Sequence, residues 1–172
     1  PSDHNPHRSA RRPVAPTIRI HKRFGKEINT KTLPNKPQEN CTVSKHIRIR
    51  KGTTVDYHKL AEFHYHEYKR LPPPRNIFAM ERTHVDEPIG VIVYSYPPPM
   101  CFGRNKALQG RRLKLKELNN QLSIISRVIL HPKYRTIGLG AKLVKETLAL
   151  AGTPSVEAVA VMAKYNPFFE KA

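Results

Sequence analysis

The segment covering residues 124–152 places strong limits on how this chain folds. It begins with IISRVIL over residues 124–130, a run rich in β-branched residues that is typical of a strand buried on both faces. A loop with Gly138 and Gly140 follows, and then a stretch whose apolar residues recur at helical spacing and end before Gly152. The sequence therefore predicts a central strand, a glycine loop and an amphipathic helix in succession.

Shorter patterns on both sides of this segment predict one compact α/β or α+β domain over residues 45–172. Alternating or continuous apolar runs predict strands, and apolar residues at helical spacing predict helices. The predicted elements are strand 47–51, helix 56–69, strands 77–80 and 89–94 as a hairpin, helix 113–122, strand 124–130, helix 141–151, strand 155–162 and helix 166–172.

Residues 1–44 have a different composition and are predicted to form a basic, Pro-rich arm or linker that is partly disordered. Residues 1–51 hold 13 Lys and Arg against 3 Asp and Glu, within a chain whose formal net charge is +18. Such a segment buries too little apolar surface to offset its chain entropy. Within it, residues 17–22 alternate apolar and basic side chains and predict a strand, as residues 46–51 do. Clustered charge of this kind favours contact with RNA or the ribosome, and a solvated linker is the alternative.

Several classes of protein are excluded or disfavoured. No run of about 18 apolar residues is present to span a membrane. No secretory signal is readable, so a cytoplasmic protein is expected. Cys41 and Cys101 are too far apart for a CxxC zinc pair, and His58, His64 and His66 lack the spacing of helical metal ligands, so no metal site is predicted.

The glycine loop has the composition of an anion-binding turn. It matches neither a Walker A loop, because the loop contains no Gly-Lys pair, nor a Rossmann fingerprint, because Leu143 stands where the third glycine is needed. A strand, a glycine loop and a helix N-terminus still present unpaired amides to a pyrophosphate, and the guanidinium of Arg135 is expected either to close over the loop or to meet phosphate. An ordinary glycine-containing turn is the alternative.

The motif Arg135-x-x-Gly138-x-Gly140, preceded by VILHPKY over residues 128–134, resembles the acetyl-CoA signature of the GNAT superfamily of N-acetyltransferases. The resemblance covers residues 46–172 and is specific over 122–151. It implies a mixed, mostly antiparallel central sheet flanked by helices, here without the final strands of the family. Residues 91–98, 101–105 and 165–171 resemble more particularly the acetyltransferase domain fused to ABC-type ATPases, which would place the ATPase outside this chain.

The resemblance implies an enzyme that transfers an acetyl group from acetyl-CoA to an amine. Main-chain groups of the central strand would pair with the pantetheine arm, and amides of the glycine loop would hold the pyrophosphate. The implied cofactor-binding residues are Val128, Ile129, Leu130, Arg135, Thr136, Ile137, Gly138, Leu139, Gly140, Ala141 and Asn166.

The catalytic acid and base are less well marked. Where the family has a Tyr that protonates the thiolate, this chain has Phe169, which leaves Tyr165 or a water as the general acid. Glu157 is the only carboxylate on the central and following strands and is the predicted general base; its alternative is an ion pair with a Lys or Arg. Glu81 and Asp86 are weaker candidates.

The acceptor amine is the least defined part of the prediction. The positive charge favours an RNA-linked or ribosome-linked amine over a polycationic one, and a protein acceptor is the alternative. Two other functions stay open: a non-catalytic acetyl-CoA-binding regulatory module, and a nucleic-acid-binding adaptor that uses the basic arm.

Overall fold

The computed structural model describes residues 17–21, 46–64, 70–108, 110, 112–159, 169 and 172. Six strands form one sheet in the order β1-β6-β5-β4-β3-β2. The strands from β2 to β5 are antiparallel to their neighbours, and β5, β6 and β1 are parallel. The predicted mixed, mostly antiparallel sheet is confirmed. Its strands are β1 Thr17–His21, β2 Ile47–Lys51, β3 Pro74–Arg82, β4 Pro88–Ser95, β5 Leu122–Leu130 and β6 Ser155–Val159.

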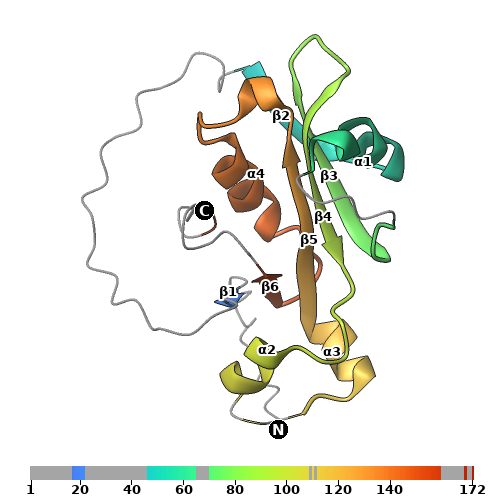
Figure 1. The fold of residues 1–172 in the computed structure, drawn as a ribbon, viewed down its shortest axis with the longest axis vertical. Helices are drawn as coiled ribbons and strands as arrows, with labels where there is room; N and C mark the ends of the chain where they lie inside the picture. The colour runs from blue at the N-terminus through green and yellow to red at the C-terminus, as the bar shows by residue number, and fades with distance from the viewer. Residues whose placement is uncertain are drawn as a thin grey trace, which may run out of the picture.

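Helices cover both faces of the sheet (Figure 1). Leu139, Leu143 and Val144 of α4 are buried against one face, and Tyr57 and Leu60 of α1 are buried against the other. No helix among the described residues is long and apolar enough to cross a membrane. The helices are α1 Thr54–Leu60, α2 Phe102–Ala107, α3 Leu115–Gln121 and α4 Leu139–Leu148, with 3-10 helices at Ala61–Phe63 and Pro132–Tyr134.

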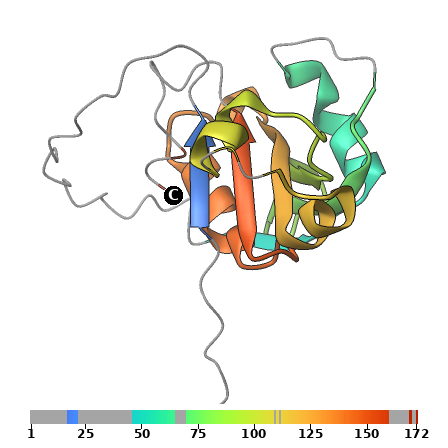
Figure 2. The same ribbon diagram turned by 90° about the horizontal axis from the view of Figure 1, so that it is seen from below.

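Most of the predicted elements are present with shifted ends. The alternating segments at residues 17–22 and 46–51 both contain strands, and Figure 2 shows β1, in blue, beside β6. The helix at 113–122 is α3, whereas α2 lies in a stretch for which no helix was predicted. The predicted helix 166–172 lies outside the described residues except for two positions.

The prediction of a helix over residues 56–69 is wrong at both ends. The helix starts earlier, because Thr53 caps it by accepting from the amide of Asp56, and it ends at Leu60. After the 3-10 helix, His64 is extended at φ −79° and ψ 132°. The carbonyl of Phe63 accepts a hydrogen bond of 2.7 Å from Nη2 of Arg135, 72 residues away in sequence. This tertiary contact holds the chain where a longer helix would have continued.

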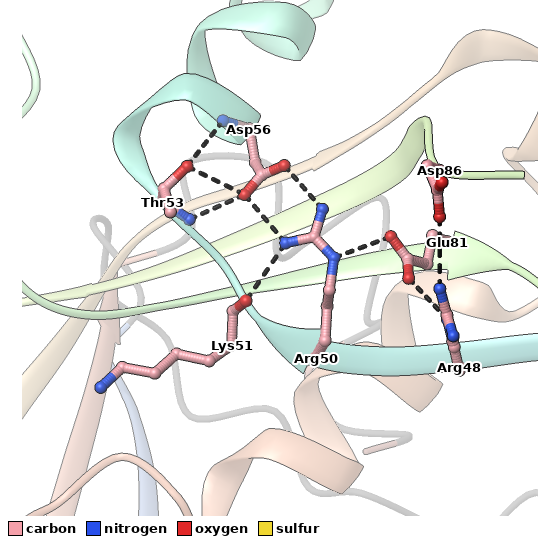
Figure 3. Close-up of polar contacts among 7 residues, drawn as sticks. All are labelled: Arg48, Arg50, Lys51, Thr53, Asp56, Glu81 and Asp86. Atoms are coloured by element: carbon pink, nitrogen blue, oxygen red, sulfur yellow. Dashed lines mark hydrogen bonds and ion pairs between the residues drawn. The ribbon is translucent and has the colours of Figure 1, made fainter.

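An ion-pair network joins β2, β3 and the start of α1 (Figure 3). Arg50 donates from Nη2 to Oδ1 of Asp56 at 2.8 Å and from Nε to Oε2 of Glu81 at 2.7 Å. Arg48 donates from Nε to Oε1 of Glu81 at 2.5 Å. Glu81 is only 1% exposed, so its charge is buried and compensated by two arginines. The two weaker candidates for the general base therefore differ in burial. Glu81 is buried, whereas Asp86 lies at the surface with its Oδ1 3.4 Å from Nη2 of Arg48.

The network changes the titration of both buried carboxylates. Hydrogen bonding by Arg50 outweighs burial and lowers the pKa of Asp56 from 3.8 to about 2. Burial on its own would raise the pKa of Glu81, but the hydrogen bonds from Arg50 and Arg48 prevail and lower it. Both groups therefore stabilise the fold in their ionised form.

The lowered pKa of Asp56 predicts a loss of stability in acid. The contribution, about 2 kcal/mol, is complete above pH 4 or so and is lost progressively as the pH falls through about 2. Urea unfolding of Asp56→Asn should show a lower free energy of unfolding at pH 6 and a weaker loss on acidification than the parent protein. Asp86→Asn, at an exposed position, is the control and should keep the parental pH dependence. Equal acid slopes for Asp56→Asn and the parent would contradict this account.

Candidate functional site

The central strand β5 loses its neighbour on one side halfway along its length. It pairs with β6 from Leu122 to Ile125, and the last pair joins Ile125 to Ala158. β6 ends at Val159, whereas β5 continues to Leu130 beside β4. In the part of the chain that the structure describes, no strand lies along the other edge of residues 126–130. This edge is open to an extended ligand.

The register decides which main-chain groups face the open edge. The amide of His131 donates to the carbonyl of Ile89 at 2.8 Å, so His131 and Ile129 direct their main-chain groups toward β4. By alternation, Val128 and Leu130 direct theirs away from β4. Ile129 instead contributes a buried side chain on the α1 face. The carbonyl of Leu130 already accepts from Nε of Arg135 at 3.1 Å, which leaves its amide and both groups of Val128 for a ligand.

A bulge in β5 lies where the two strands separate. Val93 pairs with Arg127 and Tyr94 with Ile125, so Ser126 is an extra residue. Its hydroxyl lies 2.8 Å from Oγ of Ser95 and 3.2 Å from the carbonyl oxygen of Val93. The bulge redirects the strand at the start of its open edge.

The loop after β5 turns sharply into α4. Thr136 and Gly138 have left-handed backbones, with φ values of 71° and 83°. Gly138 is the N-cap of α4, and no side chain caps the helix there. The first bond of the helix runs from the amide of Lys142 to the carbonyl of Gly138 at 3.1 Å.

The N-terminus of α4 has the features of an anion site. The amides of Leu139, Gly140 and Ala141 precede the first helical hydrogen bond and have no acceptor within the helix. The first turn holds no acidic residue, so the positive end of the helix dipole is not neutralised from within. Leu139 is only 2% exposed and fixes this end of the helix to the core. Ile137 is partly exposed beside it.

Arg135, for which closing over the loop and meeting phosphate were both predicted, is bound to main-chain carbonyls of the protein. Its guanidinium binds the carbonyls of Leu130 and Phe63, so it ties the glycine loop to the end of β5 and to the 3-10 helix after α1. The ring of Phe63 packs edge-on against His131 at 4.8 Å between centroids. Arg135 thus positions the loop, and its side chain remains exposed beside it.

Glu157, the predicted general base, lies in a buried ion pair. Its Oε1 and Oε2 accept from Nε and Nη2 of Arg104, each at 2.8 Å. Arg104 comes from α2 and also donates to the carbonyl of Pro98 at 2.8 Å. Because Glu157 is the β6 neighbour of Ile124, its Cα lies about 8 Å from that of Ser126.

The other predicted catalytic residue cannot be placed. Tyr165 and Asn166 lie outside the described residues. Phe169 packs against the apolar cluster on the α4 face. No group of three or more His, Cys, Asp or Glu side chains suited to a metal occurs among the residues that the structure describes.

Two features of the site were missed from the sequence. Arg104 lies in a polar stretch with five other basic residues nearby and carries no signal that distinguishes it from them. Ser126 stands out only as a small hydroxyl residue inside a β-branched run, which does not by itself indicate a bulge. The register that brings it to Ser95 depends on the fold.

Comparisons with known proteins give partial likenesses only. No family model and no curated protein matches the sequence. Among solved structures, a GNAT-family acetyltransferase from Streptococcus pneumoniae TIGR4 is 17% identical over 72% of this chain and 83% of its own, with a TM-score of 0.46. An aminoglycoside acetyltransferase from an uncultured soil metagenomic sample, solved with sisomicin, is 12% identical over 75% and 88%, with a TM-score of 0.47. A Trypanosoma brucei acetyltransferase is 19% identical over 73% and 89%, with a TM-score of 0.45. At these values, the function of the chain has to be inferred from its own residues.

The two glycines of the loop should respond in opposite ways to alanine. Gly138→Ala puts a Cβ on a left-handed backbone and should cost about 1 kcal/mol of stability or slightly more. Gly140 lies within α4, where alanine is favoured over glycine, so Gly140→Ala should stabilise the protein by roughly 0.5 kcal/mol or more. Urea unfolding of both variants measures the difference. Changes of the same sign would contradict the backbone geometry of this turn.

Proposed function

We propose that this chain is a GNAT-type N-acetyltransferase that moves an acetyl group from acetyl-CoA to an amine. One observation carries the proposal: the open edge of β5 leads directly to the N-terminus of α4. The open edge of β5 offers main-chain hydrogen-bond partners to an extended chain, and the N-terminus of α4 offers amides to an anion. A ligand with an extended amide-containing arm next to a pyrophosphate matches this order of groups.

The residues present fit that ligand. The carbonyl of Val128 and the amide of Leu130 would pair with the arm as an added strand would, and the amides of Gly138, Leu139, Gly140 and Ala141 would hold the pyrophosphate. Thr136 turns the loop with its left-handed backbone, Arg135 ties the loop to the end of β5, and Ile129 anchors β5 in the cluster on the α1 face. Ile137 and Asn166 stay predictions.

The chemistry asked of the protein is mainly positioning. The amine nitrogen bonds to the thioester carbonyl carbon, the carbon–sulfur bond breaks, the nitrogen loses one proton to solvent and the departing thiolate takes one up. Holding both reactants in place on β5 lowers the activation barrier by up to roughly 7 to 11 kcal/mol. The amide of Val128, which faces the open edge, is placed to stabilise the oxyanion of the attacked carbonyl.

Glu157 is proposed to act on this site through its ion pair. It is the carboxylate predicted as general base, and it projects from the same sheet face as the bulge. Both of its carboxylate oxygens already accept hydrogen bonds from the buried guanidinium of Arg104, each at 2.8 Å. We therefore assign it the task of holding α2 against β6, and proton removal from the amine falls to solvent.

Other partners stay predictions. Contact with RNA or the ribosome rests on charge in residues 1–45, of which only residues 17–21 are described. An ABC-type ATPase rests on the sequence resemblance alone. The acceptor class, an amine on RNA-associated material or on protein, is to be found by screening.

Binding of acetyl-CoA tests the cofactor site. Calorimetric titration should give micromolar affinity for the parent protein and no detectable binding for Gly138→Glu, because the carboxylate would occupy the anion site. Gly110→Glu is the matched control, since Gly110 also has a left-handed backbone, at φ 81°, and open space around it. It should lose similar stability and bind as the parent does.

Either of two results would contradict the cofactor site: a folded parent that gives no heat with acetyl-CoA, or equal loss of binding in the two glutamate variants. Binding without any acetyl transfer to a screen of amines would instead favour the non-catalytic acetyl-CoA-binding module.

Glu157→Gln tests the role of the buried carboxylate. Removing its charge leaves Arg104 buried without an anion, which should cost about 3 kcal/mol of stability. Activity should fall at every pH, with the shape of the pH–rate profile unchanged. A profile that loses its acidic limb while the free energy of unfolding stays constant would establish Glu157 as the general base instead.

A further inference from the structure

The hydroxyl of Ser126 occupies a special place at the candidate active site. It belongs to the extra residue of the β5 bulge, directly after the last pair between β5 and β6. We infer that Ser126 positions the incoming amine by accepting a hydrogen bond from one of its N–H groups. The inference rests on the proposed acetyl transfer and adds the residue that orients the acceptor.

The face of the sheet on which Ser126 lies is fixed by its neighbours. Tyr94 packs on the α4 face, and Val93 packs on the α1 face. Ser95 follows Tyr94 and therefore projects toward the α1 face, where its Oγ meets Oγ of Ser126 at 2.8 Å. Ser126 thus projects from the face opposite α4, while the open edge of its own strand begins at the same residue.

Glu157 projects from the same face of the sheet as Ser126. Val156 and Ala158 pack in the cluster on the α4 face, so Glu157 between them projects from the other face. In Figure 1, α1 lies toward one end of β5 and α2 and α3 toward the other. Ser95 is fully buried whereas Ser126 is partly exposed, so solvent reaches the pair from the side of Ser126.

The hydrogen bonds of the pair leave Ser126 with a free acceptor position. The carbonyl of Val93 can only accept, so Ser126 donates its single hydrogen there, at 3.2 Å. Ser95 then donates to Ser126, which uses one of the two lone pairs on Ser126 Oγ. The remaining lone pair suits a donor, and with its hydrogen committed, Ser126 does not compete for the lone pair of an amine.

A primary amine bound in this way is ready for attack. One N–H is donated to Ser126, and the nitrogen lone pair stays available to form the bond to the acetyl carbonyl carbon as the carbon–sulfur bond breaks. The nitrogen then loses its extra proton to solvent, and the thiolate of CoA is protonated from solvent. Ser126 is neither acid nor base in this step; it fixes the orientation of the nitrogen.

The test uses hydroxylamine as a small acceptor, because it has N–H donors and no group that needs a recognition pocket. Release of CoA from acetyl-CoA is followed with a thiol reagent, corrected for hydrolysis. Ser126→Ala should lower kcat/KM for hydroxylamine about fivefold to tenfold, as expected for one lost hydrogen bond, with the Kd for acetyl-CoA unchanged. Ser126→Thr keeps the hydroxyl and should restore most of the rate.

Ser123→Ala is the matched control. Ser123 lies on the same strand, and its buried hydroxyl accepts from Thr153 at 2.9 Å, but it lies where β5 and β6 are paired. It should lose stability like Ser126→Ala and keep kcat/KM. Equal rates for Ser126→Ala and the parent, or equal losses in the two alanine variants, would overturn the inference and leave the proposed function intact. A parent that binds acetyl-CoA and does not accelerate its reaction with hydroxylamine would overturn both.

Discussion

Among the described residues, β5 has a strand on both sides at its beginning and on one side at its end, and the other features of the site follow from this asymmetry. A buried strand with an unpaired edge has main-chain groups that must find partners elsewhere. Here the unpaired part starts at the bulge, runs past Val128 and leads into a loop whose left-handed residues direct α4 back over the sheet. An edge for an extended chain and an amide cluster for an anion are thus produced by one strand and its turn.

The buried pair of Arg104 and Glu157 connects this strand arrangement to the helices at the start of β5. Each charge compensates the other, and Arg104 also satisfies a carbonyl of the Pro98 region. Such a pair adds little net stability compared with an apolar contact, but breaking it is costly. Its effect is to define one position for α2 beside β6, in the same way that Arg135 defines one position for the glycine loop.

Local sequence determined the parts of this fold that depend on local physics. A β-branched run predicts β5 wherever it lies in a sheet, and the spacing of Ala141, Val144, Leu148 and Ala151 predicts an amphipathic helix. The end of α1 could not be predicted, because a hydrogen bond from a residue 72 positions away holds Phe63.

In the candidate site, too, some features depend on local sequence and others on contacts between distant elements. Its glycine loop was predictable because left-handed turns and helix starts need particular residue types. The partners of Ser126 and Glu157 depend on strand register and on a helix that has no clear signal of its own. Predicting them required the pairing of elements that are distant in sequence.

The pairing of β1 with β6 joins the first and last of the described strands in chain order. The strands from β2 to β5 each pair with the next strand in the chain, so the loops that their contacts close are much shorter than the loop between β1 and β6. β1 does not pair with the next strand in the chain. It can pair with the sheet only when β6 is already in place, after closing a loop that includes nearly all other elements. The sheet is therefore expected to assemble from its β2 side, with β1 as the last strand to associate during folding and the first to leave during partial unfolding.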